Sequence, residues 1–347
     1  MTETGKPSVS VVMPVYNAER FVATAMQSVL AQSLSDFELL VVNDGSQDNS
    51  VKICQSLADR RTRILHQRNF GVSSARNTGI ANARGGIIAL LDSDDIWAPE
   101  KLDRHVAHLR RRGDVGISYA GSKLIDEAGR SLGIYQRPVL HGVTPHDVFC
   151  GRVIRNGSVP VFRREVLDEI AWRAPANGER LCYFDESFRQ SEDVECWTRI
   201  ALTSRWTFEG VPGELTSYRV NSRGISADVI GQLESWERAC AKVATYRPDF
   251  VAAHGKEARA RELRYLARRA FSKHDRELAL KLALEAWPQL IRDEPVKTSV
   301  TLTACALLRI MVRTFLRPAS SRLTAPALGA MTPRSGARIR VKSQPLV

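Results

Sequence analysis

The chain has 347 residues, of which 44% are hydrophobic and 25% charged, and this composition is that of a globular protein with room for about two domains. Its net charge of +12 is uneven, because 21 basic and 8 acidic residues lie from Cys240 onward, against 29 and 30 before it. The six cysteines are scattered without paired spacing, which argues against a disulfide framework or a cysteine-rich zinc site. We expect a cytoplasmic protein, because no charged segment followed by a long apolar run opens the sequence.

The first part of the chain alternates between apolar runs and helical patterns. The runs that read as strands are 8–13, 37–42, 64–65 and 87–91. The helical patterns between them are 21–32, 51–57 and 73–83. We expect Pro14 to end the first strand. This β-α-β-α order predicts an α/β fold with a doubly wound, mostly parallel sheet.

Polar clusters follow three of these strands, at 14–17, 43–46 and 92–95. Because the carboxyl ends of parallel strands share one edge of a sheet, we expect the clusters to line one cleft. The last holds three carboxylates, which repel one another unless a cation neutralises them. Mg²⁺ or Mn²⁺ would suit these oxygens and could bridge the phosphates of a nucleotide. Taken alone, a solvated acidic turn that caps a helix is the simpler interpretation.

Four short motifs occur in order along this part of the chain. They are Pro-Val-Tyr-Asn at 14–17, Asn-Asp-Gly-Ser at 43–46, Asn-Phe-Gly-Val-Ser-Ser-Ala-Arg-Asn at 69–77 and Leu-Asp-Ser-Asp-Asp at 91–95. Together they resemble the family 2 inverting glycosyltransferases, which have the GT-A fold. The resemblance continues through 157–165, 184–186 and 191–197, and it fades after about residue 228. Asn221 stands where the family's late Tyr-Arg-x-His element has its histidine.

The resemblance implies a nucleotide-sugar donor, UDP- or dTDP-linked, and a role for each matching residue. The residues that it places against the donor are Pro14, Tyr16, Asn17, Asp44, Arg76, Asp92 and Ser93. Asp94 would hold a divalent metal, Mg²⁺ or Mn²⁺, and Asp193 would be the general base that takes the proton of the acceptor hydroxyl. The residues that would support them are Glu192, Asp95, Trp197 and Arg219.

The main site residues also have purely structural interpretations. Asp44 could be the first residue of an Asp-Gly turn, and Arg76 could be an exposed helix arginine. Glu192 and Asp193 could be ordinary acidic residues at the start of a helix. Trp197 fits core packing better than stacking on a sugar.

The division of the chain follows from where the resemblance ends. We expect a GT-A nucleotide-sugar-binding domain over 1–230 and a helical extension over 231–297, whose last predicted helix ends at Pro288. Residues 298–317 are a candidate amphipathic helix, because two arginines make a bilayer span too costly. Residues 318–347, rich in Pro, Ser, Gly and Arg, are expected to be disordered.

The last part of the chain also predicts a partner. Residues 295–347 hold nine basic residues and no acidic one, which favours an anionic membrane surface on the cytoplasmic side. Packing of the apolar helix candidate on the catalytic domain is the alternative. We expect no nucleic acid as a partner, because aromatic residues are not interleaved with the basic ones.

The sequence as a whole predicts transfer of a sugar, with inversion, to a hydroxyl of a saccharide or lipid-linked saccharide in cell-surface polysaccharide or glycolipid synthesis. Two alternatives are a sugar nucleotidyltransferase and a non-catalytic nucleotide-sugar-binding module. The missing N-terminal Gly-rich phosphate loop counts against the first. The intact Asp92, Asp94 and Asp193 count against the second.

Overall fold

The computed structural model describes residues 5–173, 180–221, 224 and 228–290. These residues belong to one compact unit, which spans 1–297. The expectations for 298–317 and 318–347 therefore lie outside the described residues.

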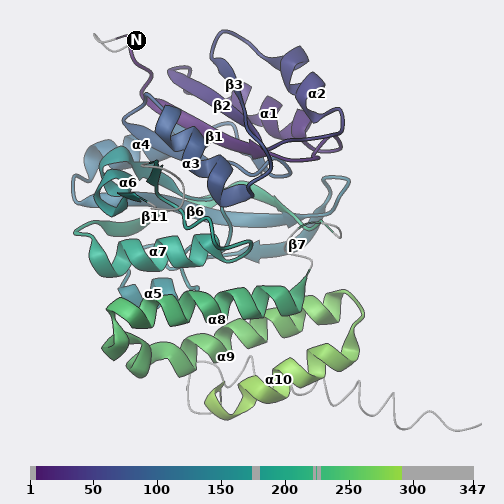
Figure 1. Ribbon diagram of the computed structural model, residues 1–347, viewed down its shortest axis with the longest axis vertical. Helices are drawn as coiled ribbons and strands as arrows, with labels where there is room; N and C mark the ends of the chain where they lie inside the picture. Colours follow the sequence, from purple (N-terminus) through teal and green to yellow (C-terminus); the bar gives the residue numbers. More distant parts are fainter. Residues whose placement is uncertain (1–4, 174–179, 222–223, 225–227, 291–347) are drawn as a thin grey trace, which may run out of the picture. The chain divides into compact units, whose positions relative to one another are not determined.

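Nine strands of the described chain form one sheet in the order β3-β2-β1-β4-β8-β6-β11-β5, with β7 paired to β6 (Figure 1). Their bounds are β1 Val9–Val15, β2 Phe37–Asn43, β3 Thr62–His66, β4 Ile87–Leu90, β5 Ile96–Trp97, β6 Val115–Ile125, β7 Ser131–Gln136, β8 Val161–Arg163 and β11 Thr207–Arg219. The longest ladders, β1 with β2 and β6 with β11, are parallel, whereas the short strand β8 runs antiparallel between β4 and β6. The predicted α/β sheet is confirmed.

Helices cover both faces of this sheet. One face packs against α1 (Val22–Leu30), α2 (Ser50–Leu57) and α4 (Lys101–Arg111), and the other against α3 (Val72–Asn82), α6 (Arg164–Ile170) and α7 (Glu192–Thr203). Neighbouring residues of β1 accordingly enter different cores: Val11 packs with α1 and Val12 with α3. The strand is apolar except for Ser10, whose buried hydroxyl donates to Glu38 at 2.7 Å, because neither face meets water.

The first strand does not end at Pro14 as predicted, and β1 continues to Val15. The Val12 carbonyl accepts a hydrogen bond from the Leu91 N–H at 3.1 Å, so even-numbered residues of β1 turn their backbone groups toward β4. The pairing of β1 with β4 ends at Val12. Pro14 therefore lacks an N–H only on a side where no partner strand needs one.

Four helices pack beyond α7 on the side away from the sheet (Figure 1). They are α5 (Pro145–Phe149), α8 (Val229–Tyr246), α9 (Pro248–Ser272) and α10 (Arg276–Leu290). The ring of Phe149 stacks on Trp236 of α8 and meets Phe250 of α9 edge-on, and Val194 and Leu202 of α7 pack against this cluster. Strands β9 (Trp172–Arg173) and β10 (Leu181–Cys182) form a separate small sheet.

The prediction that Pro288 ends its helix is wrong, since α10 runs to Leu290. Pro288 lies in the last turn, where the missing N–H removes a hydrogen bond only at the end of the helix. Among the described helices, none is both long and apolar enough to cross a membrane.

Candidate active site

Hydrogen bonds hold together the turns that follow β1 and β2. The Asp44 N–H donates to the Val15 carbonyl at 2.8 Å, and the Gln47 N–H donates to Asn17 Oδ1 at 2.8 Å. Asn17 has a φ of 46°, a left-handed conformation that Asn tolerates better than most residues. The neighbouring side chain of Tyr16 is 48% exposed. These turns form the strand-end edge that the sequence predicts, with Tyr16 open to a ligand.

The Asp44 carboxylate is buried and faces the loop before α3. It accepts hydrogen bonds from the Gln67 side chain at 2.8 Å, the Phe70 N–H at 3.0 Å and the Gly71 N–H at 2.8 Å. Gly71 has a φ of +92°, which favours glycine at the point where this loop turns into the helix. In this arrangement Asp44 stabilises the loop, and a nucleotide base would have to compete with these donors.

Arg76 joins the strand-end turn to the start of α7. The guanidinium leaves α3, donates to Asp92 Oδ1 at 2.7 Å and to Glu192 Oε1 at 2.6 Å, and is 2% exposed. Burial opposes its charge, but Asp92 and Glu192 outweigh that effect and raise the pKa of Arg76 above its usual value. Gly157 admits it, since a Cβ there would lie 2.3 Å from Nη2. The interpretation as an exposed helix arginine is wrong.

Asp95 anchors the acidic turn to the rest of the fold. Its fully buried carboxylate accepts hydrogen bonds from the Ser158 hydroxyl at 2.6 Å and from the Arg219 N–H at 2.8 Å. Ser158 Oγ in turn accepts from the Asp92 N–H at 2.9 Å. The Arg219 side chain donates to the backbone carbonyl of Asp94 at 2.7 Å, so this arginine fixes the backbone of the acidic turn. Asp95 and Arg219 thus position the turn that carries Asp92 and Asp94.

Negative charge in this turn is only partly compensated. Burial, with Asp92 adding to it, raises the pKa of Asp94 to about 6, and Asn221 hydrogen-bonds its side chain. Burial and the two neighbouring carboxylates also raise the pKa of Asp95. Ser93 lies partly buried between Asp92 and Asp94. Clustered carboxylates of this kind fit a hard divalent cation, which would relieve their repulsion.

The second acidic pair begins α7. Ser191 precedes the helix with a φ of 57°, and the Val194 N–H donates to Asp193 Oδ1 at 2.8 Å. Burial raises the pKa of Glu192 to about 7 against the opposing effect of Arg76. Burial likewise raises the pKa of Asp193, which Arg76 lowers and Asp92 raises. Asp193 is therefore electrostatically linked to the acidic turn.

Trp197, one turn further along α7, belongs to the core. Its ring stacks on Phe162 at 5.2 Å and meets Phe184 edge-on at 5.7 Å, and it is 2% exposed. These ring contacts favour core packing over sugar stacking, although Trp197 also lines the cavity next to Asp193.

Two residues inside the recognised motifs organise the site although neither was assigned a role. Asn77 Oδ1 accepts from the Tyr183 N–H at 3.0 Å and the Phe184 N–H at 2.8 Å, which fixes the segment that leads to α7. Ser158 bridges Asp92 and Asp95 as described. Both residues lie in the motifs at 69–77 and 157–165, and that position could have predicted a role for them. Buried polar residues of this kind need specific hydrogen-bond partners.

A further group of metal-binding residue types lies between α5 and α9. Ligand atoms of His146, Cys150 and Glu257 lie within 4.8 Å of one another. His146 Nε2 is already hydrogen-bonded to Glu257 at 2.9 Å, and Arg261 pairs with the same carboxylate at 2.7 Å. These contacts account for the group without an ion.

Comparison with known proteins identifies the catalytic part. Residues 10–171 match the family described as Glycosyl transferase family 2. This part of the chain is a family 2 glycosyltransferase domain. An uncharacterized glycosyltransferase of Rickettsia bellii is 32% identical over 215 residues, which cover 61% of this chain and 29% of that protein. The uncharacterized glycosyltransferase RP339 of Rickettsia prowazekii is 28% identical over 233 residues, 67% of this chain and 70% of that protein.

Solved structures show the same fold for the family 2 domain and the helices after it. Residues 1–349 of TarS from S. aureus, in complex with UDP-GlcNAc, have a TM-score of 0.54 and 15% identity over 81% of this chain and 89% of that one. The mannosyltransferase PcManGT from Pyrobaculum calidifontis, in complex with GDP-Man and Mn²⁺, has a TM-score of 0.53 and 20% identity over 91% and 89%. The predicted GT-A fold is confirmed.

Proposed function

We propose that the chain transfers a sugar, with inversion, from a UDP- or dTDP-linked donor to a hydroxyl acceptor. The observation that supports this most is the pairing of Arg76 with both Asp92 and Glu192. It joins the turn expected to hold the donor's phosphates to the residue next to the expected base. Inverting displacement needs these two chemistries on either side of one sugar carbon.

The donor would lie along the strand-end edge. Tyr16 and Asn17, after Pro14 at the end of β1, offer an exposed ring and backbone groups to the base and ribose. Asp92 and Ser93 of the acidic turn, both partly exposed, would also contact the donor. Complexes of TarS with UDP-GlcNAc and of PcManGT with GDP-Man support a nucleotide-sugar donor on this fold.

Asp94 would hold a divalent metal, Mg²⁺ or Mn²⁺. A bound metal would neutralise charge on the departing diphosphate, a stabilisation of several kcal/mol (roughly a hundredfold in rate or more). Carboxylate oxygens are the appropriate ligands, and the raised pKa of Asp94 marks an acidic turn that a cation would relieve. Asp95 and Arg219 hold the turn in place for it.

Asp193 would remove the proton of the acceptor hydroxyl while the hydroxyl oxygen attacks the anomeric carbon. The donor's bond to its diphosphate breaks on the opposite side, and the configuration inverts. Because its pKa is raised, Asp193 is a stronger base than an exposed aspartate. Glu192, paired with Arg76, would fix the first turn of α7 that carries it.

A screen of nucleotide sugars for hydrolysis and transfer, with and without Mn²⁺, tests this function. We expect one donor class to be consumed only when the metal is present. The anomeric configuration of the product, read by NMR, tests inversion separately. Consumption of no nucleotide sugar would contradict the activity, and a retained configuration would contradict the mechanism.

We also propose a division of roles along the chain, with catalysis in 1–230 and membrane attachment through 295–347. The support is the nine basic residues and the absence of acidic ones in that last segment. The enzyme would then work on the cytoplasmic face of the membrane, on saccharide or lipid-linked saccharide acceptors for surface polysaccharide or glycolipid. Co-sedimentation with anionic liposomes, comparing the full chain with one that ends at Glu294, tests it. Equal binding by both would exclude the segment as the anchor.

A further inference from the structure

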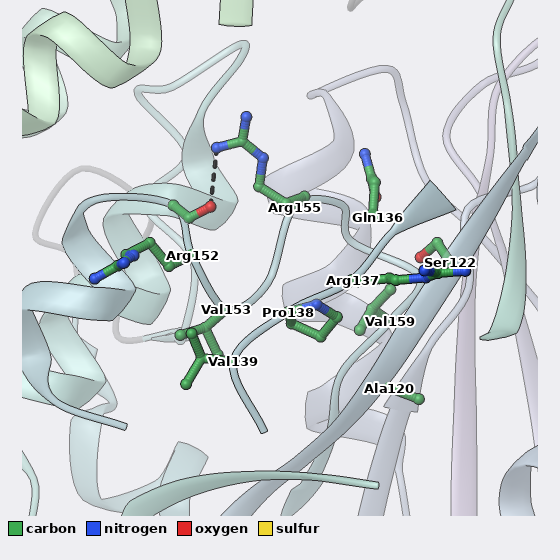
Figure 2. Close-up of a pocket in the computed structure, with 11 residues that line it drawn as sticks. Ala120, Ser122, Gln136, Arg137, Pro138, Val139, Arg152, Val153, Arg155 and Val159 are labelled. Atoms are coloured by element: carbon green, nitrogen blue, oxygen red, sulfur yellow. Dashed lines mark hydrogen bonds between the residues drawn. The ribbon is translucent and has the colours of Figure 1, made fainter. Parts of the chain in front are cut away.

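Two adjoining cavities share Gly151 and Arg155. The first has a volume of about 380 Å³ and lies between β6, β7 and the segment that leads to β8 (Figure 2). The second is bounded by α5, the start of α7, α8 and α9, and Asp193 is one of its lining residues. The second cavity thus offers an acceptor hydroxyl an approach to Asp193.

The two cavities differ in charge. Arg137, Arg152 and Arg155 line the first cavity, and no acidic residue is among its lining residues. Asp193 and Glu262 are the acidic residues that line the second. The two cavities therefore adjoin at Arg155, with a larger basic one on one side and a smaller acidic one, of about 70 Å³, on the other.

Arg155 stands at the boundary between them. Its Nη1 donates to the Gly151 carbonyl at 3.0 Å, and its guanidinium lies 4.3 Å from the ring centre of Tyr265 on α9. Figure 2 shows Arg155 between Arg152 and Arg137, with the bond to Gly151 dashed. Arg152 pairs with Asp147 at 3.0 Å and Arg137 only loosely with Glu214 at 3.7 Å. Arg155 forms no ion pair with a carboxylate of the described residues.

Glu262 on α9 faces the second cavity. Burial raises its pKa, Arg155 lowers it and Asp193 raises it, so both charges act on this carboxylate. Within the described part of the chain it forms no hydrogen bond, although it is well placed to accept one from a ligand in the cavity. Hydroxyl groups of a saccharide are the donors that such a carboxylate binds.

We propose that the acceptor is a saccharide with an anionic group, a phosphate or a carboxylate, and that it lies across both cavities. Its reacting hydroxyl end lies between Asp193 and Glu262, and its anionic group meets Arg155 at the basic end. This inference rests on the proposed role of Asp193. It assigns part of the acceptor wall to α8 and α9, which lie beyond the residues that match the family, through Trp236, Glu262 and Tyr265.

The test measures binding of acceptor probes to the protein saturated with Mn²⁺ and the nucleoside diphosphate that it binds, so that the donor site is filled. The probes are inorganic phosphate, N-acetylglucosamine 1-phosphate, methyl N-acetylglucosaminide, methyl glucuronide and farnesyl-diphosphate-linked N-acetylglucosamine. We expect the phosphate-bearing sugar to bind at least roughly tenfold more tightly than the neutral glycoside, since a charged hydrogen bond contributes about 1.5–3 kcal/mol. Tighter binding of the lipid-linked probe than of the 1-phosphate would identify a lipid diphosphate as the source of the anion. Equal binding would identify a soluble anionic glycan.

Two variants and one control separate recognition from folding. Arg155→Gln should abolish the preference for anionic probes and leave nucleotide affinity unchanged. Glu262→Gln should weaken neutral and anionic sugars alike, because both present hydroxyls. Arg205→Gln, at a 76% exposed side chain paired with Glu169, should change neither.

Equal affinity for anionic and neutral probes in the unaltered protein would overturn the proposal, as would a preference that Arg155→Gln leaves intact. Failure to bind any nucleoside diphosphate would instead contradict the proposed function. In that case the same probes titrated into the free protein still decide whether Arg155 binds an anion.

Discussion

The two acidic pairs of the site, Asp94 with Asp95 and Glu192 with Asp193, share one arrangement on different elements. In each pair one carboxylate is fixed by the fold: Asp95 by Ser158 and Arg219, and Glu192 by Arg76. Burial raises the pKa of all four carboxylates. In each pair, the carboxylate that the fold holds in place also positions the carboxylate next to it in sequence. That second carboxylate could then bind a cation or accept a proton.

The pairs differ in what fixes them. The strand-end pair is held by a hydroxyl and a backbone N–H, which are neutral, whereas the helix pair is held by a guanidinium. Arg76 opposes the effect of burial on Glu192 and Asp193, whereas in the acidic turn neighbouring carboxylates add to it. In the proposed function, the first pair would hold the metal through Asp94 and the second would take the proton through Asp193.

The largest expected effect is that of Asp193→Asn. The amide keeps the shape but cannot accept the acceptor's proton, so kcat should fall by at least roughly a hundredfold while nucleotide affinity is retained. Steady-state kinetics and calorimetry measure the two quantities. Asp249→Asn is the matched control, at another aspartate in the first turn of a helix, and it should leave kcat unchanged. A near-normal kcat in Asp193→Asn would remove this residue as the base.

Asp94→Ala should reduce metal-dependent nucleotide binding and turnover by roughly tenfold to a hundredfold. The reason is that the substitution removes the carboxylate proposed to hold the metal, while Asp95 still anchors the turn. Calorimetry of UDP with and without Mn²⁺ measures the effect. If the variant binds UDP as the unaltered protein does, and neither depends on Mn²⁺, the acidic turn does not hold the metal.

Asp95→Ala should act on stability. It leaves the Ser158 hydroxyl and the Arg219 N–H without their buried acceptor, at a cost of about 3 kcal/mol in the free energy of unfolding. Urea unfolding measures the free energy of unfolding of Asp95→Ala and Asp94→Ala, and we expect the larger loss in Asp95→Ala. Equal losses of stability would show that the fixed and free roles are not divided as described.

The smallest expected effect is on the pH dependence. Glu192 has a pKa of about 7 and is ionised above it, so lowering the pH through 7 protonates it and weakens its pairing with Arg76. We expect kcat to fall by a few-fold over this range, about 2.5 pH units above the range for an exposed glutamate. In Glu192→Gln that decline near pH 7 should be absent. A decline at the same pH in Glu192→Gln would assign it to another group.

The sequence by itself determined the elements and the edge at which the site forms. Strands β1, β2 and β4 appear as apolar runs because both faces of the sheet are covered, and polar residues follow each of them. The spacing of apolar residues is a local property of the sequence, so it predicts these strands without knowledge of the fold. It failed at Pro14 and Pro288, where hydrogen-bonding context decides whether proline is tolerated.

Only the tertiary structure decided what each polar side chain does. Arg76 and Glu192 are 116 residues apart in sequence, and nothing local to either shows that they form an ion pair. Asp44, which the family motif places against the nucleotide, accepts hydrogen bonds from the N–H groups of a loop, and Trp197 packs against Phe162 and Phe184. No sequence pattern predicted that α9 lies close to Asp193. Buried polar groups take whichever partners the packed fold brings within hydrogen-bonding distance, and that choice is made only when distant segments meet.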